Sequence, residues 1–402
     1  MALEIDSRCR ELFDELRRDG FSEQFHAPSP EAEGTISAWT SAHHALSLRH
    51  IDAAVARAEL LAVYHACQRD DGLVARERRE GGLDELGVEL DSDGRSRFID
   101  PPVAAYAVAR MILDGQLDSD ELLEAATRQF DAIWAERLPP DTSIPVILHP
   151  IESATPHSSL FEGVVESRTG PEWYAEIANV ARSAIGVDLQ PARALRAGHA
   201  FVVEDPVFAG WLLIALEDLG RAHEEAGDSA TSLKFRVRSN MIKDAIQERL
   251  WWPNEEIFGA FDRARGEPLR GVTAGGLVPA ASTGILEEGG GKRAVERHLR
   301  PSAAPLWGAH GLSIEPQPRD QEEVDLRTGR AVTPIAQFWA HLALSRAGRN
   351  ADARVARGQL ENLVEGHGFH ERYDPRSGAP SGRRGFSLGT LLLEMRASDE
   401  RR

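Results

Sequence analysis

Residues 51–68 read IDAAVARAELLAVYHACQ, and their apolar side chains recur every three to four positions. That spacing matches the turn of an α-helix, so one face of the segment is expected to be apolar. The side chains that we place on this face are Ile51, Val55, Ala58, Leu61 and His65. The segment therefore predicts an amphipathic helix, and Cys67 near its end is expected to be a small core residue.

The same periodicity continues on both sides of this helix and covers most of the chain. Asp118 stands three residues before Glu121, a spacing typical of a helix N-terminus, and apolar positions recur after it. Further helices are expected at 3–19, 37–48, 102–115, 173–186, 206–226, 229–250, 292–300, 334–347, 350–364 and 387–397. No stretch alternates polar and apolar residues over the length of a strand, so any sheet should be small and local. The sequence therefore predicts an all-α protein.

Long segments rich in glycine and proline separate these helices. They occupy 138–172, 252–291, 301–333 and 366–386. Loops of this length in a compact domain usually carry function or small structures of their own. A bundle favours short turns, whereas a toroid of helix hairpins carries its active site on such loops. The glycine run at 289–291 is too short to divide the chain, so a single domain covering 1–402 is expected.

The composition is that of a folded globular protein and excludes several classes of partner. Of the 402 residues, 42% are hydrophobic and 27% charged, and the formal net charge is −18. That charge argues against nucleic acid or an anionic membrane as a partner, because both require a basic surface. No apolar run is long enough to cross a bilayer, and the charged N-terminus lacks the apolar centre of a secretory signal. We therefore expect a cytoplasmic protein, and the excess of arginine over lysine is typical of GC-rich bacterial genes.

Neither a disulfide scaffold nor a metal centre is predicted. The chain has two cysteines, too few for a disulfide framework or a thiolate site. Its 14 histidines include no HExxH pair or other tight ligand spacing. The glycines at 275–276 and 289–291 lack the Lys-Ser/Thr pair or the strand–helix context that a phosphate loop requires. We therefore expect no metal and no other cofactor.

Short motifs along the chain occur in an order that resembles one family of enzymes. The fragments are WTSAHHA at 39–45, QRDDGLV at 68–74, DPPVA at 100–104, HPIES at 149–153, VEDPVF at 203–208, TAGGLVP at 273–279, GFHERYDPRSG at 368–378 and FS at 386–387. Each is short, but their common order resembles mannosylglycerate-hydrolase-like and, more broadly, trehalase-like glycosidases. The resemblance implies an (α/α)6 toroid, a six-hairpin barrel with long loops on its active-site face. A shared fold does not by itself fix the reaction.

Several positions depart from the pattern of that family. The resemblance places the general acid of the family after the HPIES fragment, where this chain has Pro156. Of the catalytic pair that it implies, only the base, Glu371, keeps its full context. The other departures are Thr40 for a substrate-binding aspartate, Ala75-Arg76 for Pro-His, and residues 329–334 and 337–338 for an Arg- and Trp-rich segment. The catalytic motifs are therefore degenerate.

Loss of the acid changes the chemistry that the site supports. Inverting glycosidases use two carboxyl groups about 6.5–9.5 Å apart, one to protonate the leaving oxygen and one to activate water. Proline has no proton to give, and general acid assistance is typically worth about 10²–10⁴ in rate. Ordinary alkyl glycosides are therefore expected to be poor substrates. Residues that could supply a substitute acid are Glu152, His157, Glu172 and Asp205, although Asp205 also fits an ordinary helix N-cap.

The expected site contains Glu371 as its catalytic acid or base. Residues expected to contact the substrate are Trp39, His43, Arg76, Glu152, His157, Trp307 and Tyr373. Some of them also have a plainer interpretation. A lone histidine such as His43 more often packs in a core, and Glu152 belongs to the family pattern without being its acid. Trp211 follows helical spacing and is expected in the core.

We expect a glycosidase scaffold adapted to a different small-molecule substrate. A pocket that shapes a substrate around one acid/base residue suits cyclisation, elimination or isomerisation, and specialised metabolism is a natural setting. Two alternatives stay open. An inverting glycosidase with a relocated acid requires a second carboxylate facing Glu371, whereas a non-catalytic ligand-binding protein would tolerate Glu371→Gln. The oligomeric state does not follow from the sequence.

Overall fold

The computed structural model describes residues 2–32, 34–84, 87–88, 90–118, 121–167, 169–301, 305–316 and 329–401. The helices in these ranges are α1 Ala2–Leu16, α2 Ala38–Leu48, α3 Ala53–Cys67, α4 Val103–Leu113, α5 Glu121–Glu136, α6 Gly170–Gly186, α7 Pro191–Ala197, α8 Pro206–Glu225, α9 Ser229–Arg249, α10 Thr283–Glu287, α11 Gly290–His298, α12 Pro334–Arg346, α13 Asn350–His367 and α14 Leu392–Glu400. Every helix expected from the sequence is present, so the predicted all-α class is confirmed.

The strands are short and form small local sheets, as predicted. They are β1 Arg17–Gly20, β2 Glu23–His26, β3 Thr35–Ser37, β4 Glu77–Arg79, β5 Val203–Glu204, β6 Trp251–Trp252, β7 Ile257–Phe258, β8 Ala260–Asp262, β9 Glu267–Leu269, β10 Trp307–Gly308, β11 Gly311–Leu312, β12 His370–Tyr373 and β13 Pro380–Arg384. Each sheet among the described residues has two or three strands, and these strands pair antiparallel. No helix in the described part of the chain is both long and apolar enough to span a bilayer.

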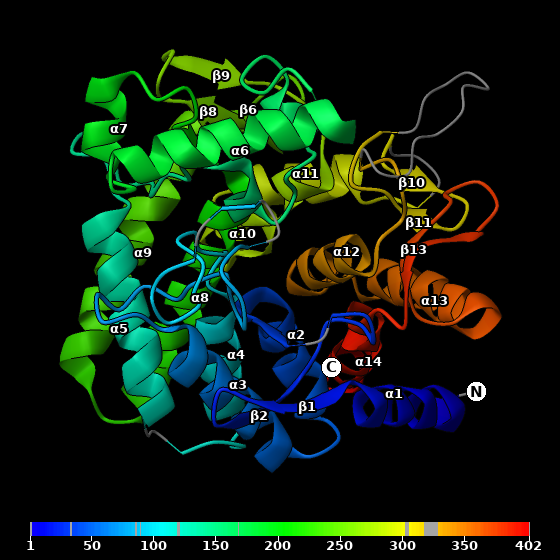
Figure 1. Ribbon diagram of the computed structural model, residues 1–402. Coiled ribbons are helices and arrows are strands. Elements are labelled where there is room, and N and C mark those ends of the chain that lie inside the picture. The colour runs from blue at the N-terminus through cyan, green and yellow to red at the C-terminus, as the bar shows by residue number, and fades with distance from the viewer. Residues whose placement is uncertain are drawn as a thin grey trace.

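The helices form a closed ring of hairpins (Figure 1). The inner ring runs from α2 through α4, α8, the 3-10 helix η4 (Pro279–Ala281) and α12 to the final segment, in which η6 (Ser387–Leu391) leads into α14. Contacts of η6 and α14 with α2 close this ring. The outer helices are α3, α5, α9, α11 and α13, and α1 comes from the opposite end of the chain to lie beside the final segment. This is the (α/α)6 toroid that the motifs imply.

The inner helices are apolar on nearly every side because they are surrounded by other elements. In α8, almost all residues between Pro206 and His223 are buried. Trp211 is fully buried in this helix, which confirms its predicted place in the core. Packing is close at Gly210, where a Cβ atom would lie 2.8 Å from the backbone nitrogen of Pro279. Any side chain at position 210 would therefore push two members of the inner ring apart.

Helix α3 packs through a different face from the one predicted. Its buried side chains are Ala56, Glu59, Leu60, Ala62, Val63, Tyr64, Ala66 and Cys67. The expected burial of Cys67 is confirmed, but Ala58 and His65 of the predicted face are exposed. The predicted helix is therefore correct, but its predicted face is only the edge of the buried one, since Ile51, Val55 and Leu61 are partly buried against the core.

Glu59 explains this orientation. Its side chain is 1% exposed, and its two carboxylate oxygens lie 2.8 Å from His26 Nδ1 and 3.1 Å from His44 Nδ1. These hydrogen bonds lower the pKa of Glu59 to about 2, against the effect of burial, which raises it. A fully paired carboxylate can be buried, so α3 turns this polar residue inward. Hydrophobic periodicity alone does not indicate such a position.

Buried ion pairs tie the inner helices together near the C-terminal ends of α2, α4 and α12. Arg49, which follows α2, donates to the two oxygens of Glu394 on α14 at 2.7 and 2.9 Å. The same guanidinium donates to Asp114, just after α4, at 2.6 Å. Arg346 of α12 donates to Asp218 of α8 at 3.0 Å. These pairs connect the first helix of the inner ring to the last.

Candidate functional site

A pocket of about 260 Å³ lies where several inner helices begin. Its walls come from the start of α2, the start of α12, the start of η6, the loop at 154–158 and the β12–β13 hairpin. The lining residues are Trp39, Ala154, Thr155, Pro156, His157, Ser158, Ile314, Gly329, Ala331, Thr333, Pro334, Ile335, Glu371, Arg372, Phe386 and Leu388. Most of these side chains are apolar, and Glu371 is the one carboxylate among the described lining residues. We refer to this cavity as the Glu371 pocket.

Glu371 stands on β12 and is held by two donors. Its Oε1 lies 2.8 Å from Arg372 Nη2, and its Oε2 accepts a hydrogen bond from the backbone N–H of Arg383 on β13 at 3.2 Å. The side chain is 27% exposed. Across the hairpin, Gly382 has a φ of +73°, and a Cβ atom there would lie 2.7 Å from Glu371 Oε2. Glycine at 382 therefore leaves the space that the carboxylate occupies.

The turn of this hairpin is fixed by Asp374. Its Oδ1 accepts hydrogen bonds from the backbone N–H groups of Arg376 and Ser377, both at 2.8 Å. Earlier in the hairpin, the pairing register shifts between His370 and Arg372. A shift of this kind re-aims side chains on a strand. The two neighbours Glu371 and Arg372 both line the pocket.

Tyr373 does not line the Glu371 pocket. Its side chain is buried, and its hydroxyl donates to the Gly368 carbonyl at 2.6 Å and accepts from the His370 N–H at 3.1 Å. Burial raises the pKa of this phenol to about 12. The geometry therefore gives Tyr373 a role in fixing the hairpin, and its predicted substrate contact stays a prediction.

The loop at 154–158 forms the wall that carries Pro156. Ala154 takes a left-handed conformation with a φ of +60°, and the chain then turns through Pro156 into His157. The His157 ring lies 4.1 Å from the Trp173 ring, centroid to centroid. Pro156 and His157 both line the pocket, so the position at which the resemblance places an acid faces the cavity with a proline.

Trp39 lines the pocket, and His43 lies behind it. The His43 Nδ1 is 2.7 Å from the Trp39 carbonyl oxygen, which requires a proton on Nδ1, and the two ring centroids are 4.4 Å apart. Burial lowers the pKa of His43 to about 3, so the ring is neutral. His43 is fully buried and outside the lining. The His43 ring contacts Trp39, and its predicted substrate contact stays a prediction.

Arg76 and Trp307, two further predicted residues, also lie outside this lining. Arg76 forms ion pairs with Glu77 at 3.2 Å and Asp100 at 3.8 Å. Trp307 is 8% exposed and pairs with Leu312 in the β10–β11 hairpin. These contacts are within the protein. The predicted substrate contacts of Arg76 and Trp307 stay predictions.

Glu152 is a structural residue in this geometry. It is fully buried, and Arg137 Nη2 lies 2.8 Å from its Oε1. Its oxygens also accept the backbone N–H groups of Ile99 at 3.1 Å and Leu148 at 2.8 Å. Both carboxylate oxygens are thus engaged inside the protein, and Glu152 is outside the lining of the Glu371 pocket.

Several pocket residues were not identified from the sequence. Arg372 and Phe386 belong to the motifs at 368–378 and 386–387, but the residues predicted for the site are neighbours of Arg372 in the first of these motifs. Glu315 belongs to none of the motifs, so the sequence did not indicate it. It is buried beside the pocket, and its Oε1 accepts a hydrogen bond from the Ser159 N–H at 2.6 Å, which fixes the end of the Pro156 wall. Among the residues with described positions, no three His, Cys, Asp or Glu side chains could hold a metal ion.

Comparison with known proteins assigns the family. The sequence model of the mannosylglycerate hydrolase MGH1-like glycoside hydrolase domain matches residues 35–388. Mannosylglycerate hydrolase from Rubrobacter radiotolerans is 24% identical over 329 residues, which cover 74% of this chain and 73% of that one.

Solved structures share the fold. The GH63 mannosylglycerate hydrolase from Thermus thermophilus, in complex with glucose, superposes with a TM-score of 0.82 at 20% identity, over 97% of this chain and 99% of that one. Neutral trehalase from Saccharomyces cerevisiae superposes with a TM-score of 0.58 at 15% identity, over 94% and 76% of the two chains. With its toroid, its motif order and a family match over most of its length, the chain belongs to the MGH1-like glycoside hydrolase family.

Proposed function

We propose that this chain is an acid/base enzyme that acts on a small, largely apolar molecule, and that Glu371 transfers a proton without hydrolysing a glycosidic bond. The observation that carries the proposal is the lining of the Glu371 pocket. It combines one described carboxylate with a proline at the expected acid position and mostly apolar walls. Inverting hydrolysis needs a second carboxyl group, and sugars need more polar partners than these walls offer.

Isomerisation is the simplest reaction that such a site supports. The Glu371 carboxylate would take a proton from one substrate atom and return it to another, so atoms balance without water or a co-reactant. Trp39 and Phe386 offer aromatic surface for the substrate body. The guanidinium of Arg372, 2.8 Å from Glu371, lies close enough to stabilise negative charge that develops on the substrate.

A hydrolase with His157 as its acid is the second candidate. Of the four residues that could replace the missing acid, His157 is the one that lines the Glu371 pocket. Glu152 is engaged by Arg137, and Asp205 caps α8 by accepting the Phe208 N–H at 2.8 Å. Glu172 is exposed on the first turn of α6. An imidazolium at position 157 could protonate a leaving oxygen, which is the observation that keeps this function in view.

The test uses a pool of small metabolites in D2O, with wild-type protein and Glu371→Gln compared by mass spectrometry. Isomerisation through Glu371 gives a product that differs in mass from its substrate only by deuterium taken from the solvent. Hydrolysis gives two fragments that together contain one added water. We expect the first pattern with the wild type and neither pattern with Glu371→Gln.

The variant His157→Asn separates the two candidates. The proposed isomerisation survives this substitution, whereas hydrolysis with His157 as the acid does not. Efficient wild-type cleavage of alkyl mannosides or glucosides, lost in both Glu371→Gln and His157→Asn, would reject the isomerisation and establish the second candidate.

A further inference from the structure

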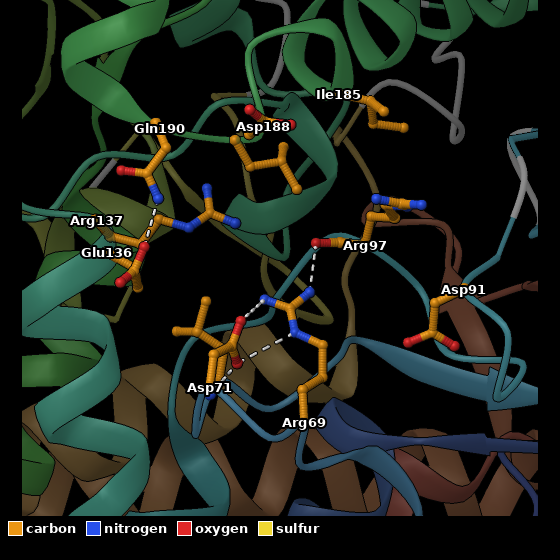
Figure 2. Close-up of a pocket in the computed structure, with 11 residues that line it drawn as sticks. Arg69, Asp71, Asp91, Arg97, Glu136, Arg137, Ile185, Asp188 and Gln190 are labelled. Carbon is orange, nitrogen blue, oxygen red and sulfur yellow. Dashed lines mark hydrogen bonds and ion pairs between the residues drawn. The ribbon is translucent and has the colours of Figure 1, made fainter.

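A second pocket, drawn in Figure 2, shares no lining residue with the Glu371 pocket. Its volume is about 280 Å³, just below the usual range for drug-sized ligands, so it suits a small molecule. It lies between the loop after α3, the end of α5 and the connection from α6 to α7. The lining residues are Arg69, Asp71, Leu73, Asp91, Arg97, Glu136, Arg137, Ile185, Asp188, Leu189 and Gln190. We refer to this cavity as the arginine pocket.

The four carboxylates of the arginine pocket all have partners within the protein. Hydrogen bonds and ion pairs satisfy each of them, and two of these interactions, those of Arg69 and Gln190, are drawn in Figure 2. The pairs are Asp71 with Arg69, Glu136 with Gln190, Asp188 with Arg193, and Asp91 with the backbone N–H groups of residues 93 and 95. Because these carboxylates are paired within the protein, the pocket has little unpaired negative charge to bind a cationic ligand.

The arginines, in contrast, include N–H donors that have no acceptor within the described structure. The Arg97 guanidinium, with five N–H groups, has no hydrogen-bond or ion-pair partner among the described residues, and it lies at the pocket near Ile185 (Figure 2). Arg137 is fully buried, and its Nε has no acceptor in the described structure, although its Nη atoms pair with Glu152. An unpaired buried donor is costly, so an acceptor supplied by a ligand would be favourable here.

Arg69 lies between these two arginines and is already oriented. Its Nη1 donates to the Arg97 carbonyl oxygen at 3.0 Å, and its other nitrogens face Asp71. Leu73, Ile185 and Leu189 add aliphatic surface to the same cavity. Within the described part of the chain, the pocket thus combines an exposed guanidinium without a protein partner, that of Arg97, and one buried donor without an acceptor, Arg137 Nε, with an apolar wall.

We propose that the arginine pocket binds a small organic monoanion, with its carboxylate at the arginines and a short aliphatic body against the leucine and isoleucine side chains. Arginine matches a carboxylate because its N–H groups present a planar fork. A single negative charge fits better than two, since four acidic side chains line the same cavity. The proposal is independent of the reaction at Glu371.

The probe is 4-methylpentanoate, which carries a carboxylate on a branched aliphatic chain. Its uncharged counterpart, 4-methylpentanamide, is the matched control. Calorimetric titration and ligand-observed NMR at low ionic strength are expected to give saturable binding of the acid and much weaker binding of the amide. Added salt should weaken the binding of the acid, because the contact is partly exposed.

Two substitutions locate the site. Arg97→Gln removes the unpaired guanidinium. It is expected to lower the affinity for 4-methylpentanoate by about tenfold or more, as loss of a charged hydrogen bond does. Ile185→Trp fills the cavity while leaving Arg97 in place, and it should have a similar effect. Glu371→Gln should leave the affinity unchanged, because Glu371 lines the other pocket.

Three results would overturn the proposal. These are an absence of saturable binding by the wild type, wild-type affinity in both Arg97→Gln and Ile185→Trp, or loss of binding in Glu371→Gln alone. Circular dichroism of each variant confirms that the fold is intact, and Arg97 is exposed, so its replacement should not disturb packing.

Discussion

Glu371 and Pro156 line the same pocket from segments that lie more than two hundred positions apart in the sequence. If Glu371 transfers the proton and position 156 takes no part in the chemistry, the two positions respond differently to substitution. Glu371→Gln is expected to lower the turnover measured by deuterium uptake by about 10²–10⁴, the usual value of general acid–base catalysis. Pro156→Ala, the matched control, should retain activity within a small factor. Equal loss in both variants would mean that the shape of the wall, rather than the carboxylate, governs the reaction.

Gly382 sets the position of the Glu371 carboxylate across the hairpin. We expect Gly382→Ala to reduce deuterium uptake strongly, because the new Cβ would lie 2.7 Å from Glu371 Oε2 and the φ of +73° disfavours alanine. The same substitution at Gly378, also at a positive φ but in contact with His310 rather than Glu371, is the control. Activity measured beside thermal stability separates displacement of the carboxylate from general unfolding. An intact activity in Gly382→Ala would contradict the proposed role of Glu371.

Asp205 should make stability fall as pH rises through the acid-to-neutral range. Burial raises the pKa of this N-cap carboxyl from 3.8 to about 7 in the folded protein. Between these values the unfolded chain has lost the proton and the folded chain retains it, so rising pH favours unfolding until the folded group ionises. The resulting change in the free energy of unfolding is about a few kcal/mol at most.

Asp205→Asn removes this titration and keeps an oxygen for the Phe208 N–H. We expect the free energy of unfolding of the variant, relative to wild type, to increase between pH 4 and pH 8. Denaturant titrations of both proteins at each pH measure this difference, in which the contributions of other titrating groups cancel. A difference that stays constant with pH would show that Asp205 is ionised in the folded state.

Arg49 is expected to be essential for stability. Arg49→Met would leave Glu394 and Asp114 without their buried partner, and breaking such a pair costs about 3–5 kcal/mol. The double variant Arg49→Met/Glu394→Leu should recover part of the lost stability, because it also removes the buried carboxylate that loses its buried partner in the single variant. Arg57→Met, at an exposed pair with Glu121, is the control and should change stability by less than about 1 kcal/mol. Additive effects in the double variant would indicate that Arg49 and Glu394 act independently.

Periodicity in the sequence predicted the long helices well because apolar residues recur at helical spacing along most of them. It missed α7 and α10, which are too short to show a period. It also misplaced the buried face of α3, since Glu59 is buried through its bonds to two histidines. Hydropathy treats such a glutamate as a surface residue.

Three of the residues predicted for the site line one pocket, and the other predicted residues lie outside its lining. Trp39, His157 and Glu371 come together because their motifs stand at the same end of the ring. Tyr373 follows Glu371 closely in sequence but faces the interior, and the register shift between His370 and Arg372 has no sequence signal. His43 likewise turns beneath Trp39 rather than toward the cavity. Spacing along a chain gives proximity, whereas the direction of a side chain depends on local geometry.

The pairing of Arg49 with Glu394 also has a consequence for protein synthesis. The two residues are 345 positions apart, so α2 leaves the ribosome long before its ion-pair partner has been translated. Until then Arg49 must stay hydrated, because a buried guanidinium without a partner is strongly unfavourable. The nascent ring therefore has to remain open on that side, and it can close only after Glu394 has been translated.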